Sequence, residues 1–181
     1  MGAMRTKIEI DTEGCENWSL KHGHLMFNPK FCKMLYPDCK FLLVVRHGID
    51  NVLNDCTLAE QFPQLGLGEL PRKMENRISF WSHTHIGSIH DAQNLFGNDF
   101  QIMRLEDMVF ETEQSLSCLE EFIGMKAKPG ARAACSDFVA LPPSIGRRFT
   151  TQNDHYTPMN DLDLLYHVGQ EGLRSLGYLP W

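Results

Sequence analysis

A single arginine follows an apolar run in the stretch KFLLVVRHGIDNVLND, residues 40–55. The run FLLVV predicts a buried strand, and Arg46 comes directly after it, ahead of a glycine turn and Asp50. At the carboxyl end of such a strand, a guanidinium can bind a phosphate group, because it stays charged and offers paired N–H donors. An ion pair with Glu106 or Asp107 accounts for the charge equally well. From position alone, both interpretations stay open.

The overall composition restricts what such a site could belong to. The 181 residues contain 17 Lys and Arg against 23 Asp and Glu, a formal charge of −6. An acidic chain is not suited to bind nucleic acid or an anionic membrane over a broad surface, so an anion site must be local. The length and the 43% hydrophobic content fit one globular domain covering residues 1–181.

Cysteine usage and hydropathy bear on the compartment. The six cysteines are scattered and include no C-x-x-C pair, which favours reduced thiols over disulfides. No run approaches the roughly 18 to 20 apolar residues that span a bilayer, and the amino terminus lacks the apolar core of a signal peptide. We therefore expect a cytoplasmic protein without a membrane span.

The apolar pattern alternates strands with helices, which predicts an α/β fold with a parallel sheet flanked by helices. Ligands of such sheets bind at the carboxyl ends of the strands, where Arg46 lies. The continuous run FLLVV predicts a strand covered on both faces. Strands are expected at 17–21, 41–45 and 100–105. A helix is expected from Phe27, and another after Asp50, which would be its N-cap. Further helices are expected from Glu75 to about Leu95, over 109–124 with Ile123 among its inward-facing residues, and over 162–176 with Gly177 ending it. Residues 126–160 are expected to form an extended surface excursion.

The order of the segments also resembles a known enzyme family. The chain carries in succession W-S-L-K, Y-P-D-C-K-F-L-L-V-V-R-H-G-I-D-N-V-L-N, a Trp-bearing helix, M-R-L-E-D-M-V, L-E-E-F-I-G, I-G-R-R-F and a final helix ending in L-G-Y. This order resembles the carboxyl-terminal two thirds of sulfotransferases that use 3′-phosphoadenosine 5′-phosphosulfate (PAPS). The resemblance implies a P-loop-containing nucleotide hydrolase-like fold, incomplete at its amino terminus. Residues 36–54 carry its most specific part, with His47 and Gly48 in place of the family's usual Asp and Pro.

The resemblance assigns the cofactor-binding residues. It implies that Arg46 binds the 3′-phosphate of the nucleotide. Asn54 stands where the family has a serine that helps it, and an asparagine amide can donate to a phosphate oxygen. Arg147 and Arg148 resemble a late basic segment that closes over the nucleotide in many members, with plain surface charge as the alternative.

The catalytic residues are likewise implied by the resemblance. Lys21 matches the family's lysine near the transferring sulfuryl group. Sulfuryl transfer builds charge on the leaving oxygen, as phosphoryl transfer does, and an ammonium beside that oxygen lowers the barrier. The acceptor hydroxyl also needs a general base, and the segment KHGHL offers His22 and His24, either of which could serve. A solvated loop histidine is the alternative for both.

Two further groups of polar side chains are expected to lie outside the transfer chemistry. Residues 103–109 resemble the family's R-y-E-D-L motif, and their charged side chains are expected to form ion pairs at the strand end. His83, His85 and His90 lie on one predicted helix, but no carboxylate or cysteine completes a metal site. We expect no metal cofactor, with PAPS as the co-substrate.

One family motif is not found in this sequence. No G-x-x-[RK]-[ST]-G-[ST]-like run, which in the family wraps the 5′-phosphosulfate, precedes Lys21. We expect either a fragment of a longer enzyme or a shortened relative without transfer chemistry. The sheet edge would then need a partner, supplied by homo-oligomerisation or by a strand from MRTKIEI.

Three functions follow from these observations. The first is sulfuryl transfer from PAPS to a hydroxyl or amine of a small-molecule or carbohydrate acceptor. The second is a non-catalytic sulfotransferase-like module that binds a nucleotide or a protein. The third is an unrelated phosphate-handling α/β enzyme.

Overall fold

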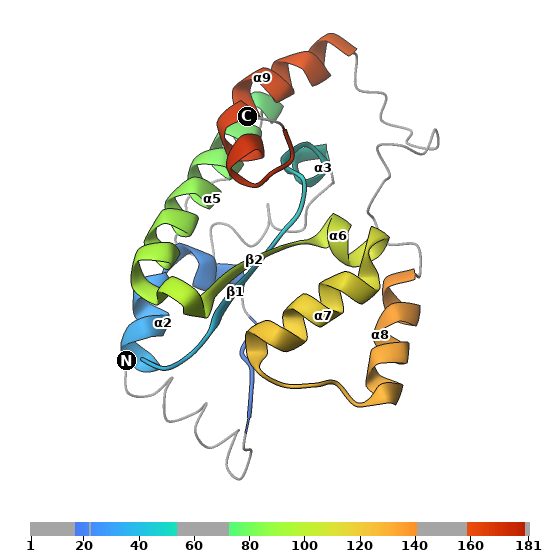
Figure 1. Ribbon diagram of the computed structural model, residues 1–181. Coiled ribbons are helices and arrows are strands. Elements are labelled where there is room, and N and C mark those ends of the chain that lie inside the picture. The colour runs from blue at the N-terminus through green and yellow to red at the C-terminus, as the bar shows by residue number, and fades with distance from the viewer. Residues whose placement is uncertain (1–16, 22, 54–72, 141–158, 180–181) are drawn as a thin grey trace.

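The structure is a computed structural model that describes residues 17–21, 23–53, 73–140 and 159–179. The described chain is α/β and mostly helical, with helices around a small parallel sheet (Figure 1). Its helices are η1 (Gly23–Phe27), α2 (Pro29–Leu35), α3 (Gly48–Leu53), α5 (Met74–Phe96), η3 (Gly97–Asp99), α6 (Leu105–Phe110), α7 (Thr112–Ile123), α8 (Pro129–Ala140) and α9 (Met159–Ser175), and its strands are β1 (Phe41–Val45) and β2 (Phe100–Arg104).

The two strands pair in parallel, with Phe41 opposite Phe100 and Val45 opposite Arg104. Parallel neighbours need a long crossover, which the chain makes through α3 and α5. This register brings both carboxyl ends to the same edge of the sheet. The predictions of strands at 41–45 and 100–105 and of a parallel sheet are confirmed.

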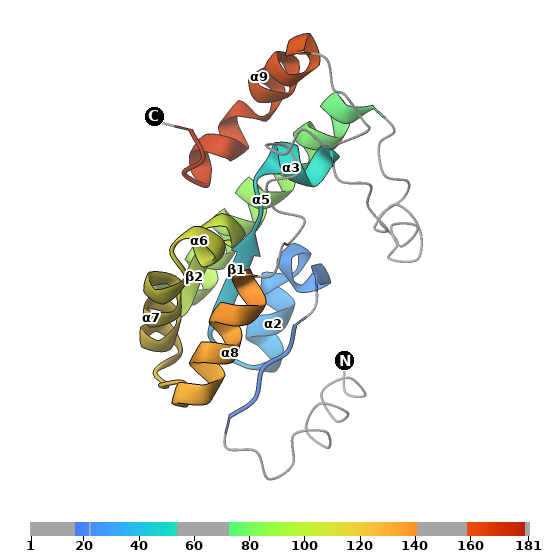
Figure 2. The same ribbon diagram turned by 90° about the vertical axis from the view of Figure 1, so that its right-hand side faces the viewer.

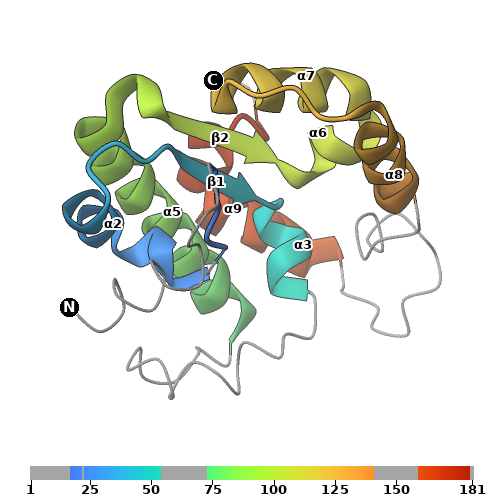
Figure 3. The ribbon, with the colours of Figure 1, turned by 90° about the horizontal axis from the view of Figure 1, so that it is seen from below.

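The core lies on one face of this strand pair. Phe41, Leu43 and Val45 alternate along β1 and are buried in one cluster with side chains of α3, α5 and α9. Helices α5 and α9 pack side by side (Figures 1 and 3). Residue Val44, on the opposite face of β1, is 50% exposed. The expectation that β1 is covered on both faces is therefore wrong at Val44, because the helices α3, α5 and α9 pack against the opposite face of β1.

The second group of helices lies beside β2. Helix α7 runs along the side of β2 away from β1, and α8 packs against α7 (Figures 2 and 3). Arg132 on α8 donates to Glu113 and Glu120 on α7, each over 2.9 Å. Residues 129–140 thus form a helix, so the expectation of an extended excursion is wrong there. The segment begins with proline and is alanine-rich, which favours a helix. Residues 141–158 lie outside the described residues.

Three local predictions also differ from the structure. Residues 17–21 form no strand, and Ile123, expected to face inward, is 40% exposed. Helix α3 begins at Gly48, so Asp50 lies inside its first turn and is not its N-cap. His47 takes that position, because its carbonyl accepts from Asn51 N at 2.9 Å and its Nδ1 accepts from Ile49 N at 3.3 Å.

Candidate functional site: the carboxyl ends of the parallel strands

Arg46 lies between β1 and α3, at the position that the sequence predicts for a ligand-facing arginine. Its side chain is half-buried, while His47, the next residue, is buried. We call these two residues the β1–α3 turn. Since Val45 pairs with Arg104, the β1–α3 turn lies beside the start of α6, where the polar residues after β2 begin.

Glu106 connects the two strand ends. Its Oε1 accepts a hydrogen bond from the backbone N–H of His47 over 2.8 Å. Its Oε2 accepts from the hydroxyl of Tyr178 over 2.8 Å. Each carboxylate oxygen therefore has a donor from a different part of the chain, which fixes the orientation of the carboxylate.

Arg104 forms a second connection at this edge. Its Nε donates to Asp107 Oδ2 over 2.7 Å, and its Nη1 donates to the carbonyl oxygen of Gly177 over 2.8 Å. The guanidinium carbon lies 5.7 Å from the centre of the Tyr178 ring, within the range of a cation–π contact. The expected ion pair after β2 is confirmed for Arg104 and Asp107. Glu106, in contrast, accepts hydrogen bonds from His47 and Tyr178.

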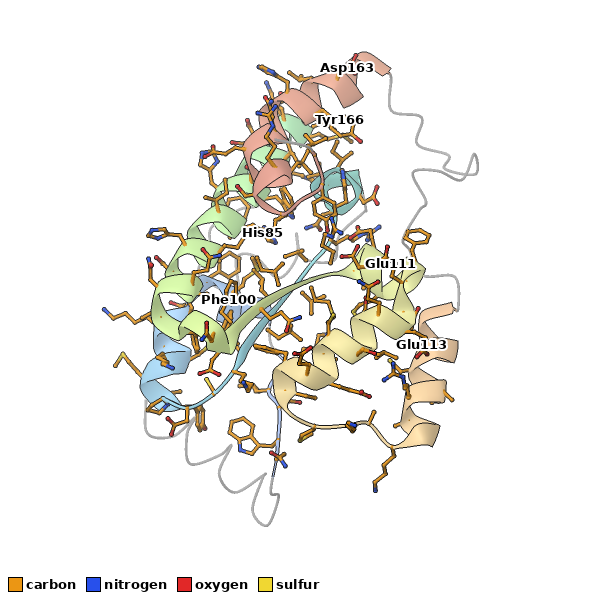
Figure 4. All side chains as sticks on the ribbon, in the orientation of Figure 1. His85, Phe100, Glu111, Glu113, Asp163 and Tyr166 are labelled. Carbon is orange, nitrogen blue, oxygen red and sulfur yellow. The ribbon has the colours of Figure 1, made fainter. Side chains whose placement is uncertain are left out.

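Tyr178 lies in a half-buried position between these charged groups. Burial raises the pKa of its hydroxyl well above the usual value, and the hydrogen bond to the Glu106 carboxylate and that negative charge raise it further. Its ring meets the His47 ring edge to face, with centroids 4.7 Å apart. Tyr166 of α9, which is labelled in Figure 4, meets the same imidazole edge to face with ring centroids 6.1 Å apart. Tyr178 therefore stays protonated and remains a donor to Glu106 throughout the neutral pH range.

Gly48 allows the β1–α3 turn to approach the core. A Cβ built on Gly48 would lie 2.6 Å from two ring carbons of Trp81 and 2.7 Å from Ile78 Cδ1. Both are buried side chains of α5, and no ordinary Cβ contact is that short. Hence α3 starts directly against α5, and only glycine fits without a shift of the aromatic ring.

A surface hollow of about 330 Å³ lies next to this cluster. It is bounded by the end of β2, by α6 and by the end of α9 with the turn that follows it: Ile102, Arg104, Asp107, Arg174, Ser175, Leu176 and Gly177. The size is sufficient for a small ligand. Arg46 is not among these lining residues, so the hollow and the β1–α3 turn are separate features of the same edge.

The other residues predicted for sulfuryl transfer are placed only in part. Lys21 is exposed and lies in the irregular segment before η1. The side chains of His22 and His24 lie outside the described residues, as do Asn54, Arg147 and Arg148. The structure therefore locates Arg46 and Lys21 but does not bring the predicted set together within the described residues.

The three histidines of α5 have local partners. His85 is buried and donates from Nδ1 to the carbonyl oxygen of Trp81 over 2.8 Å. His83 makes the same contact with the carbonyl of Ser79, and His90 is exposed beside Asp91. Within the described ranges, no group of three His, Cys, Asp or Glu side chains is placed to hold a metal ion.

Sequence reasoning overlooked the role of Tyr178. The L-G-Y ending was part of the resemblance, and glycine was expected to end the last helix. No local pattern indicates that the following tyrosine reaches Glu106, because the contact joins residues 72 positions apart. A polar aromatic residue directly after a helix-ending glycine is the one available signal.

The fold and the site together define an α/β protein with a charged and aromatic cluster at the carboxyl ends of a parallel strand pair. The chain matches no protein-family model, no curated protein and no solved structure among those compared. None of the described helices combines the length and the apolar character needed to cross a bilayer. Function is therefore inferred from the residues of this chain and their geometry.

Proposed function

We propose that the chain is a sulfotransferase-like protein whose Arg46 binds the 3′-phosphate of PAPS. The observation that carries the proposal is the position of Arg46, directly after a parallel strand and one residue ahead of helix α3, at the edge where both carboxyl ends meet. Parallel α/β sheets bind their ligands at this edge. The hydrogen bond from His47 N to Glu106 fixes the backbone next to Arg46, which favours a preorganised anion site.

In the proposed reaction, the sulfuryl group passes from PAPS to a hydroxyl or amine acceptor. The bond from sulfur to the nucleotide's phosphate oxygen breaks, a bond from sulfur to the acceptor atom forms, and the acceptor proton passes to a base. Lys21 would stabilise the leaving phosphate, and His22 or His24 would take the proton. Asn54, Arg147 and Arg148 would complete the nucleotide site.

Nucleotide binding provides the first test. Adenosine 3′,5′-bisphosphate should raise the melting temperature more than adenosine 5′-phosphate at equal concentration, because only the former has the 3′-phosphate. Charge-assisted hydrogen bonds contribute about 1.5–3 kcal/mol each. Arg46→Ala should therefore weaken the bisphosphate roughly 10- to 100-fold while leaving the monophosphate nearly unchanged.

Arg132→Ala is the matched control, since it removes a guanidinium that pairs with α7 and lies outside the β1–α3 turn. Calorimetric titration of both variants against both nucleotides separates the effects. Equal affinity of the wild-type protein for the two nucleotides would refute the proposal. A preference that survives Arg46→Ala would refute the role of Arg46.

A non-catalytic nucleotide-binding module is the second candidate, because the structure places Arg46 at the strand ends, whereas Lys21 is exposed in the irregular segment before η1. It makes the same binding prediction but expects no turnover. Incubation with radiolabelled PAPS and a panel of phenol, alcohol, amine and carbohydrate acceptors distinguishes the two. Labelled product that disappears in Lys21→Ala supports the enzyme, whereas binding without product supports the module.

A further inference from the structure

The chain after α9 returns to the edge of the sheet where Arg46 lies. Gly177 has a φ of 74°, the left-handed conformation that favours glycine. Tyr178 N donates to the Leu173 carbonyl over 2.8 Å, and Gly177 N donates to the Arg174 carbonyl over 2.9 Å. These two bonds form the Schellman arrangement that ends a helix. The turn at Gly177 and Tyr178 is thus closed by its own backbone.

Two side-chain hydrogen bonds attach this turn to the last residue of β2 and to the start of α6. Arg104 Nη1 donates to the Gly177 carbonyl, and the Tyr178 hydroxyl donates to Glu106 Oε2, both over 2.8 Å. The other oxygen of Glu106 accepts from His47 N. A continuous series of hydrogen bonds therefore runs from the end of α9, through Glu106, to the residue next to Arg46.

We propose that Tyr178 is a positioning residue for Arg46: its hydroxyl fixes the Glu106 carboxylate, which in turn fixes the backbone of the β1–α3 turn. This inference rests on the proposed function, since it concerns the direction in which Arg46 presents its guanidinium to a phosphate. With donors on both oxygens, the carboxylate has one favoured orientation. Without the hydroxyl, the carboxylate can rotate about its last bond, and His47 N loses a fixed acceptor.

The variant Tyr178→Phe removes only the hydroxyl and keeps the ring that meets His47 and Arg104. Ser88→Ala is its control, because it removes the hydroxyl that donates to the Met26 carbonyl over 2.6 Å, on α5 and away from Glu106. Both changes delete one half-buried hydrogen bond. A merely structural role for Tyr178 therefore predicts similar behaviour of the two variants.

The first measurement needs no nucleotide. The exchange of the His47 amide hydrogen is measured by NMR under conditions where both variants remain folded. This exchange should be at least fivefold faster in Tyr178→Phe than in Ser88→Ala. The second measurement is the ratio of affinities for adenosine 3′,5′-bisphosphate and adenosine 5′-phosphate. That ratio should fall about fivefold in Tyr178→Phe and stay unchanged in Ser88→Ala.

The outcomes separate this inference from the proposed function. The wild-type ratio decides the proposed function, and a ratio of one overturns both. A wild-type preference that Tyr178→Phe retains in full overturns the positioning role and leaves the proposed function standing. Equal His47 exchange in the two variants overturns it as well. Faster exchange together with a reduced ratio supports it.

Discussion

Glu106 and Tyr178 are 72 residues apart in the sequence, yet the Tyr178 hydroxyl donates to Glu106 Oε2 over 2.8 Å. The same carboxylate accepts from His47 N in the β1–α3 turn. One side chain thus joins the end of β1, the start of α6 and the turn after α9. A replacement of Glu106 should therefore change both the free energy of unfolding and the backbone geometry of the β1–α3 turn.

Glu106 accepts two hydrogen bonds, so its replacement by Ala and by Gln should lower the free energy of unfolding by different amounts. Glu106→Ala leaves His47 N and the Tyr178 hydroxyl without their acceptor, and an unsatisfied half-buried group costs about 1–3 kcal/mol. Glu106→Gln keeps the shape and one acceptor oxygen, so its cost should be clearly smaller. Urea denaturation of both variants measures the difference. Equal losses of unfolding free energy would show that the acceptor oxygen kept in Glu106→Gln does not contribute to stability, and would contradict the hydrogen-bonding role of Glu106.

Gly48 offers a test of the close approach between α3 and α5. Gly48→Ala puts a methyl group where Trp81 ring carbons lie 2.6 Å away, so the aromatic ring must shift. Overpacking of this kind costs about 1–3 kcal/mol. Gly87→Ala is the control, because Gly87 lies within α5 with no atom near its Cβ position.

Removing a glycine from a helix interior should raise the free energy of unfolding by about 0.5–1 kcal/mol. The two glycine-to-alanine changes are therefore expected to move the melting temperature in opposite directions. A neutral or stabilising Gly48→Ala would contradict the packing of α3 against α5 described above.

Most of the described elements could be predicted because their signals are local. The run FLLVV, followed directly by a polar turn, defines β1, and apolar side chains such as Ile78, Trp81, Ile89 and Phe96 recur on the buried face of α5. The first residue of α3 could not be predicted in the same way. Asp50 is a good N-cap residue, but the helix begins earlier because His47 provides the capping acceptor and Gly48 fits against Trp81.

The sequence predicts only the part of the candidate site whose signals lie next to each other along the chain. The place of Arg46 follows from a strand signal and a turn signal next to each other in the sequence. The partners of Glu106 do not, because each comes from an element brought there by the packing of α9 and the pairing of β1 with β2. Helix α8 lies outside the candidate site. Its composition favours a helix, but its ion pairs with α7 depend on tertiary contact and could not be predicted.

The cysteines should differ in reactivity. Cys32 is buried and Cys118 is exposed, and both are free thiols. Burial raises the pKa of the Cys32 thiol, and the nearby Cys39 raises it further, which lowers the fraction of reactive thiolate. Alkylation at pH 8, read by peptide mass spectrometry, should modify Cys118 at least tenfold faster than Cys32. In concentrated urea the two rates should converge, and a fast Cys32 in the folded protein would contradict its burial.

His85 should make stability depend on pH. Burial lowers the pKa of His85, although its hydrogen bond to the Trp81 carbonyl opposes the shift. The folded protein therefore keeps this ring neutral below the unfolded pKa of about 6.5, while the unfolded chain binds a proton there. The free energy of unfolding should fall as the pH is lowered from about 7.5, through 6.5, towards the folded-state pKa.

The matched variants for this pH effect are two glutamine replacements on α5. His85→Gln removes the buried ring and should reduce the pH slope of the unfolding free energy below pH 6.5. His90→Gln changes an exposed histidine on the same helix and should leave that slope as it is in the wild-type protein. Denaturation curves at several pH values between 5.5 and 7.5 provide the measurement. An unchanged slope in His85→Gln would show that another group causes the loss of stability in acid.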